Sequence, residues 1–223
     1  MSSATLEQPR ATETTDREVT VEPVVALKRR TIDSVLIGFG VVATATFAVA
    51  GGLLMWGHNF SSDYVTKELS SQNISFPSAD ALTKGERADL VQYADQKVDT
   101  GVEAQAYASF INGHLAGIAA GATYADLGAP ESAAKADVAA AVKAGKSTTE
   151  VAALQAKADV ISGQRNTMFK GETLRGLLLS AYAWSTVGTI AGYAAFGAFG
   201  AAAVMLVLVG LGLIHHRRTP RTT

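Results

Sequence analysis

Histidines and carboxylates are the residues of this chain that could bind a metal ion or transfer protons. The chain has four histidines, His58, His114, His215 and His216, and no cysteine. A metal site on a helix pairs a histidine with another ligand three or four positions away, and no acidic residue lies at those distances from His114. His215 and His216 stand beside two arginines, which is typical of a helix end at a membrane surface. We therefore expect no metal site and no thiolate chemistry.

Motifs for hydrolysis and nucleotide binding are missing from the sequence. It contains no G-x-S-x-G elbow, no P-loop and no G-x-G-x-x-G fingerprint. Asp95, Asp99 and Glu103 could share one side of a helix, but carboxylates at helical spacing usually form a solvated face. The 19 Lys and Arg residues nearly balance 20 Asp and Glu residues, and a net charge of −1 gives the chain no overall electrostatic attraction for nucleic acid. We expect no catalytic residue, no cofactor and no nucleic-acid partner, and hence not an enzyme.

The apolar residues, 48% of the 223, are concentrated in two uncharged segments. Residues 35–56 form a run of 22, about 33 Å as a helix, which matches the roughly 30 Å apolar core of a bilayer. Residues 176–214 form a run of 39, about 58 Å as a helix. Residues 182–213 contain no Pro, Asn or Asp for a turn, so we expect one overlong helix. Its part near 192–214 would cross the membrane, and the part near 174–191 would pack against the rest of the protein.

Basic residues flank both predicted spans and set their expected orientation. By the positive-inside rule both termini are cytoplasmic, and the segment between the spans, with 11 basic and 14 acidic residues, is outside. Trp56, Phe60 and Tyr193 suit an outer interfacial belt. We therefore predict a multi-pass protein of the plasma membrane. The basic residues that determine this topology are Lys28, Arg29 and Arg30 before the first span and Arg217 and Arg218 after the second.

A cleaved signal peptide is the alternative interpretation of the first span. Residues 48–50 (AVA) resemble a cleavage site, but the charged leader and the apolar run are both long for a signal peptide. We favour an uncleaved anchor, and either choice exports the central segment. The leader itself, residues 1–30, is rich in Thr, Glu, Ser and Pro, which predicts a disordered cytoplasmic tail.

The exported segment, residues 58–175, is predicted to be helical. Alanine is frequent, and the segment lacks the alternation that is typical of strands. Capping boxes, in which a Ser or Thr is followed three positions later by Glu, mark expected helix starts. These boxes pair Thr83 with Glu86, Thr100 with Glu103 and Ser147 with Glu150.

Apolar spacing between these signals predicts the individual helices of the exported segment. Pro130 suits the first turn of a helix, and Val151, Leu154, Ala158 and Ile161 repeat at heptad spacing in the segment that follows it. Residues 131–165 should therefore form a helical hairpin, weakly held because its seam is mainly Ala and Val. The expected helices cover residues 62–71, 84–98, 101–120, 131–144 and 148–162, with a connector over 72–78.

Small residues recur at short intervals in both predicted spans. Such residues let helix backbones approach closely, which is how helices associate in lipid. We therefore predict that the two spans pack on each other and leave a ridge for another chain. The residues predicted for helix packing are Gly40, Thr44, Ala48 and Gly52 in the first span and Gly188, Gly192, Ala194, Ala198 and Ala202 in the second.

Two stretches of the chain resemble a family of small two-span membrane proteins from actinobacteria. They are residues 95–114 (DQKVDTGVEAQAYASFINGH) and residues 162–184 (SGQRNTMFKGETLRGLLLSAYAW), and the resemblance extends over most of residues 35–214. Some members are described as aromatic ring-opening dioxygenases. That activity needs an iron site, for which this chain lacks the His and carboxylate set, so the sequence does not support it.

These features together predict an all-α protein. Two transmembrane helices flank an exported helical bundle or hairpin domain, and the second span is overlong and continuous with that domain. The expected function is a non-enzymatic accessory or scaffold protein of the bacterial cell envelope, in a larger membrane complex or a homo-oligomer. The alternative is a ligand-binding sensor that acts through a partner protein, its ligand unspecified. The segments are the tail 1–30, the span 31–57, the domain 58–175, the long helix 176–214 and the tail 215–223.

Overall fold

The structure, a computed structural model, describes residues 29–218, and most of these are helical. Within this part of the chain no strand forms, and a single antiparallel bridge pairs Ser75 with Lys97. The prediction of an all-α fold is therefore confirmed. The predicted tail falls almost entirely on residues 1–28, outside the described part. The helices are α1 (Arg29–Ser71), α2 (Ala79–Lys84), the 3-10 helix η1 (Ala88–Tyr93), α3 (Gly101–Ala116), the 3-10 helix η2 (Ile118–Gly121), α4 (Gly128–Lys143) and α5 (Thr148–Arg218).

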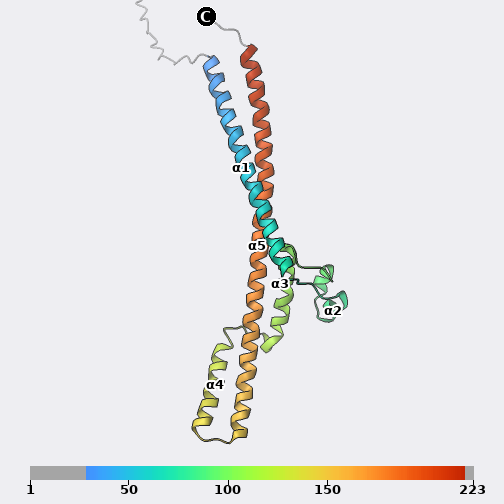
Figure 1. The fold of residues 1–223 in the computed structure, drawn as a ribbon, viewed down its shortest axis with the longest axis vertical. Helices are drawn as coiled ribbons and strands as arrows, with labels where there is room; N and C mark the ends of the chain where they lie inside the picture. The colour runs from blue at the N-terminus through green and yellow to red at the C-terminus, as the bar shows by residue number, and fades with distance from the viewer. Residues whose placement is uncertain (1–28, 219–223) are drawn as a thin grey trace, which may run out of the picture.

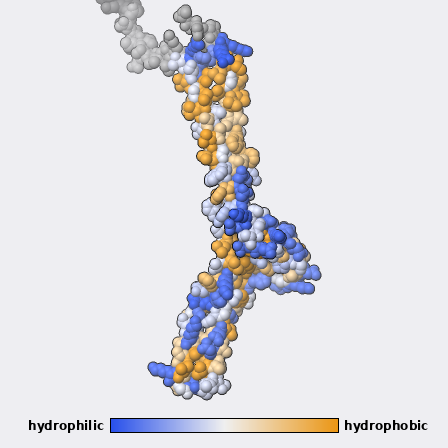
Figure 2. All heavy atoms as spheres, in the orientation of Figure 1, coloured by the Kyte–Doolittle hydropathy of each residue, from blue (hydrophilic) through white to orange (hydrophobic). Residues whose placement is uncertain are grey.

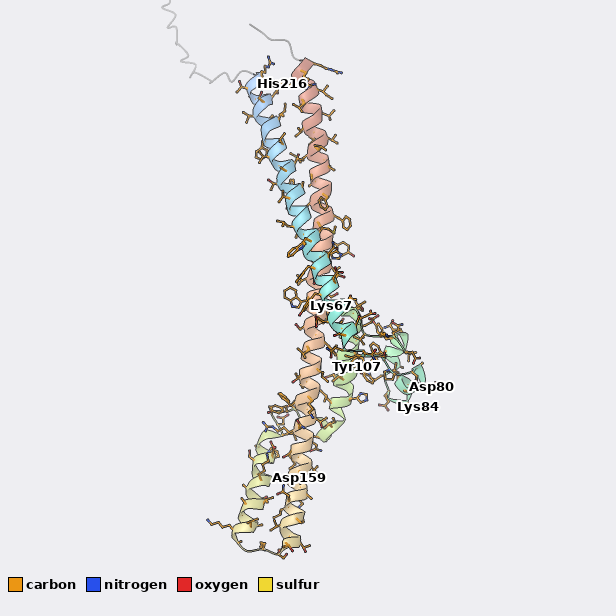
Figure 3. The ribbon with its side chains drawn as sticks, in the orientation of Figure 1. Lys67, Asp80, Lys84, Tyr107, Asp159 and His216 are labelled. Carbon is orange, nitrogen blue, oxygen red and sulfur yellow. The ribbon has the colours of Figure 1, made fainter. Side chains whose placement is uncertain are left out.

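Two long helices give the molecule the shape of a rod (Figure 1). The 43 residues of α1 and the 71 residues of α5 span about 65 Å and about 107 Å. They lie side by side and antiparallel, so the start of α1 and the end of α5 are at the same end of the rod. Both helices are long and apolar enough to cross a membrane. His216 lies near that end, and Asp159 lies toward the opposite end of the rod (Figure 3).

Both long helices extend farther than their predicted elements. Residues 62–71 were expected as a separate helix and instead continue α1, while residues 148–162 were expected as a separate helix and instead begin α5. No proline interrupts either junction, and the isolated Gly163 and Gly171 are tolerated inside a helix at a cost of about 1 kcal/mol each. Without a stop signal the hydrogen-bond ladder continues.

A small core packs α3 and the segment before it against α1 and α5. Phe76, 3% exposed, stacks on Tyr93 with ring centroids 5.3 Å apart and meets Tyr107 edge-on at 5.2 Å. This core holds α2 and η1 at the side of the rod, where they project outward (Figure 1). Its other buried members are Val65, Leu69, Leu82, Leu90, Val98, Ala104, Ala108 and Leu178.

The helix predicted over residues 84–98 is wrong. In its place α2 ends at Lys84, and only η1 is helical beyond it. Glu86 and Asp95 have positive φ angles of 57° and 60°, which a right-handed helix cannot accommodate. The N–H group of Val98 donates to the carbonyl oxygen of Ile74 at 2.9 Å, which ties this segment to the connector. Burial of Leu90 and Val98 in the shared core therefore overrides their helical spacing.

The remaining helix, α4, lies antiparallel to the first part of α5 and forms with it the arm of the rod (Figure 1). Ser147 and Glu150 form the expected capping box at the start of α5, since each backbone N–H bonds to the other's side chain. The same box at Thr100 begins α3. Thr83 begins no helix, because it lies in the last turn of α2, which Ser78 caps instead.

Candidate functional site

The contact between α1 and α5 is close because glycines lie in it. A Cβ atom at Gly40 would lie 2.6 Å from Cγ2 of Val209, and one at Gly188 would lie 2.8 Å from Cβ of Ser61. Real Cβ atoms do not approach other atoms so closely, so a side chain at either position would push the helices apart. Glycine here allows the two backbones to approach, as it does in the close helix pairs of membrane proteins.

The nine small residues predicted for helix packing fall into two groups in the structure. The buried or half-buried group consists of Gly40, Thr44, Gly188, Gly192, Ala198 and Ala202. The exposed group consists of Ala48, Gly52 and Ala194, which point away from the helix contact. Gly51 and Ala195, each one position from an exposed member, are buried instead.

A seven-residue repeat explains this division. The buried residues Gly188, Ala195, Ala202 and Val209 of α5 are seven positions apart. A step of four residues turns about 40° past a full circle, so a series with that spacing leaves the facing surface after about two steps. An average step of 3.5 residues stays on it, with a left-handed supercoil. The four residues of α1 spaced four apart therefore do not all face α5: Gly40 and Thr44 do, whereas Ala48 and Gly52 do not.

Two polar side chains of α1 bond to the backbone of α5 just beyond the uncharged run 35–56. Nδ1 of His58 lies 2.8 Å from the carbonyl oxygen of Gly188, and Oγ of Ser61 donates to the carbonyl oxygen of Trp184 at 2.6 Å. The sequence analysis did not predict this link. The pattern that points to it is the seven-residue spacing, since His58 follows Gly51, which is buried in the helix contact, by seven positions.

Charged and imidazole groups of both long helices meet at the end of the rod where α1 begins. Nε of Arg30 donates to Nε2 of His216 at 3.3 Å. Asp33 and His215 line a cavity of about 220 Å³ in the same region. Figure 2 shows hydrophilic surface at this end and mostly apolar surface along the adjoining rod. Of the residues predicted to set the topology, Arg29 begins α1, Arg30 is exposed, Arg217 and Arg218 end α5, and Lys28 lies outside the described residues.

A carboxylate attaches α4 to α5. The side chain of Glu131, 11% exposed, accepts hydrogen bonds from Nζ of Lys135 at 2.7 Å, Oγ of Ser162 at 2.8 Å and a guanidinium nitrogen of Arg165 at 2.6 Å. The bond from Lys135, followed by those from Ser162 and Arg165, lowers the pKa of Glu131 to about 2. The same guanidinium lies over the Tyr124 ring, 4.3 Å from its centroid. These groups form one polar cluster at the base of the arm.

An apolar groove opens where α1, α3 and α5 come together. It has a volume of about 560 Å³, and Tyr64, Tyr107, Leu177 and Trp184 are among the residues that line it. Tyr107 extends from α3 near the end of α1 (Figure 3), and partial burial raises the pKa of its hydroxyl. Glu68 contributes a carboxylate to the lining. The residue pattern did not predict this groove, since three separate helices form it.

Within residues 29–218 no three His, Asp or Glu side chains are close enough to hold a metal ion together. No protein-family model matches the chain, and neither a curated protein nor a solved structure is significantly similar to it. The features of the described residues that bear on function are the helix pair, the arm and the groove.

Proposed function

We propose that this chain is a non-enzymatic accessory or scaffold protein of the bacterial cell envelope. Its helices α1 and α5 anchor it in the plasma membrane, and its arm holds a partner protein outside. The observation that carries the proposal is the continuity of α5, one helix of 71 residues from the tip of the arm to the end of the rod. A helix about 107 Å long keeps the arm at a set distance from the membrane.

The exposed side chains of the helix pair support membrane anchoring. Trp56 and Tyr193 are 67% and 75% exposed, as expected of an aromatic belt at a bilayer surface. They lie at a similar level along the rod. On the side of the charged end, Gly51 of α1 approaches Phe199 of α5, and on the side of the arm His58 approaches the backbone of Gly188. Between this level and the charged end of the rod, the face of the helix pair in Figure 2 is mostly apolar. Hydrocarbon is the solvent that suits such a surface.

The arm supports a role in binding a partner. Within the described part of the chain α4 packs on no helix except α5, so one side of the arm is uncovered. Ala141 and Ala158 are its buried apolar residues in the seam, and Val142 and Val160 are 61% and 60% exposed. An arm that supports no other part of the fold is available for contact with another protein.

Site-specific photo-cross-linking in cells tests the proposal. A benzophenone amino acid in place of Val160 is expected to join the chain to one membrane protein of defined mass. The same amino acid in place of Ala183, exposed on α5 outside the arm, is the matched control. A product that joins two copies of this chain would show that the partner is a second copy and that the protein forms a homo-oligomer. Absence of any protein adduct from Val160 would contradict the scaffold role.

A further inference from the structure

The apolar surface of α5 extends beyond the part that a bilayer covers. Residues 192–214 are long enough to cross about 30 Å of hydrocarbon. Trp184 and Leu177 lie about 12 Å and about 22 Å farther along the helix, yet they are 56% and 64% exposed. Exposed apolar surface of this kind marks a place where another apolar group binds. Both side chains line the groove between α1, α3 and α5.

The size of the groove suits a small occupant. Its volume of about 560 Å³ is within the roughly 300–1,000 Å³ of small-molecule sites. A volume of this size holds a slender apolar group such as a hydrocarbon chain.

An aromatic strip connects the groove with the level of the proposed membrane surface. The rings of Trp56 and Phe60 stack with centroids 5.6 Å apart, and those of Phe60 and Tyr64 stack at 6.1 Å. All three side chains are more than half exposed. Tyr64 itself lines the groove. A hydrocarbon chain that follows this strip remains in contact with apolar surface from the bilayer to the groove.

The charges around the groove indicate which part of a lipid it would hold. Among the described residues that line it, none is Lys, Arg or His, and Glu68 provides the carboxylate. An anionic phosphate would find no positive charge there and would be repelled by Glu68. We propose that this groove binds one acyl chain of a membrane lipid, with the head group left outside. This inference rests on the proposed anchoring of α1 and α5 in the membrane.

The two tryptophans of the chain allow a direct test in nanodiscs. The full-length protein is inserted into phosphatidylcholine nanodiscs whose acyl chains carry bromine, a contact quencher of tryptophan fluorescence. The variant Trp56→Phe leaves Trp184 as the reporter in the groove. The variant Trp184→Phe leaves Trp56 as the reporter at the membrane surface. Emission is compared with that in nanodiscs of unbrominated lipid.

Two leucines on opposite sides of α5 provide matched substitutions. Leu177 lines the groove and Leu179 does not, and both are exposed, at 64% and 37%. Either replacement by Glu leaves the buried core intact. In the Trp56→Phe background we expect bromine to quench Trp184, Leu177→Glu to abolish the quenching and Leu179→Glu to retain it.

The quenching of the two tryptophans distinguishes the acyl-chain site from the membrane anchoring. Quenching of Trp56 without quenching of Trp184 would overturn the acyl-chain site and leave membrane anchoring intact. No quenching of either tryptophan would contradict the anchoring itself. Equal quenching of Trp184 in both glutamate variants would mean that lipid covers the whole helix surface, which also overturns a specific site.

Discussion

Glu131 of α4 and Arg165 of α5 form an ion pair at 2.6 Å across 34 positions of sequence. The pair connects the two helices of the arm at its base, close to the buried side chains of Leu127 and Met168. Farther toward the tip, the buried apolar residues of the seam are Ala141 and Ala158, which bury little area. The polar cluster around Glu131 therefore adds to a small apolar contact in holding the arm closed.

Replacement of Arg165 should loosen the arm. In the variant Arg165→Gln, Glu131 loses a charge-assisted hydrogen bond, and we expect the amides of α4 to exchange with deuterium about tenfold faster. Lys157→Gln removes the same charge from an exposed position of the arm and should leave the exchange unchanged. Hydrogen exchange followed by mass spectrometry measures both variants. Equal exchange rates in the two would show that the cluster does not hold α4.

The attachment of the arm should also depend on pH. The pKa of Glu131 is about 2 in the folded protein, below its ordinary value of 4.5. A carboxyl group whose pKa is lowered by folding stabilises the folded state above its unfolded pKa, and this contribution is lost as the pH falls through the folded pKa. We therefore expect exchange in α4, corrected for intrinsic rates, to accelerate between about pH 5 and about pH 2.

The variant Glu131→Gln is the comparison for this pH profile. Asp126 and Glu150 also have a lowered pKa, caused by hydrogen bonds from Thr123 and Ser147, and they contribute in acid as well. Glu131→Gln keeps those groups and should lose the part of the acceleration that belongs to Glu131. If the wild-type protein and the variant gave the same profile, the assignment to Glu131 would be wrong.

Adjacent glycines of α1 test the seven-residue repeat of the helix contact. A Cβ atom at Gly51 would lie 2.8 Å from the Phe199 ring, whereas one at Gly52 would meet nothing within 4 Å. We expect Gly51→Val to destabilise the helix pair by about 1–3 kcal/mol through overpacking. Gly52→Val makes the same chemical change on the exposed side and should be nearly neutral. Thermal unfolding in mild detergent compares them, and equal losses would exclude the repeat.

Single cysteines can establish the orientation, because the chain contains no natural cysteine. Ser147 lies at the tip of the arm, and Thr31 lies in the first turn of α1 at the other end of the rod. We expect a membrane-impermeant maleimide to label Ser147→Cys in intact cells and to label Thr31→Cys only after lysis. The reverse pattern would place the arm in the cytoplasm and contradict the proposed topology.

Local signals predicted those features that depend on neighbouring residues. The capping boxes at Thr100 and Ser147 begin α3 and α5, because each uses atoms within four positions of the chain. The same pattern at Thr83 failed, since Ser78 had already begun a short helix and Glu86 took a positive φ angle. A local pattern is therefore informative only where no neighbouring pattern competes with it.

Composition and helix rise suffice to predict the helical class and the two uncharged segments long enough to cross a bilayer. The tertiary structure decided which small residues face the partner helix, since the supercoil of two helices replaces a step of four by an average of 3.5. It also brought together Glu131 with Arg165 and three helices around the groove. Those contacts join residues far apart in the chain, and only the packed fold brings them within reach of one another.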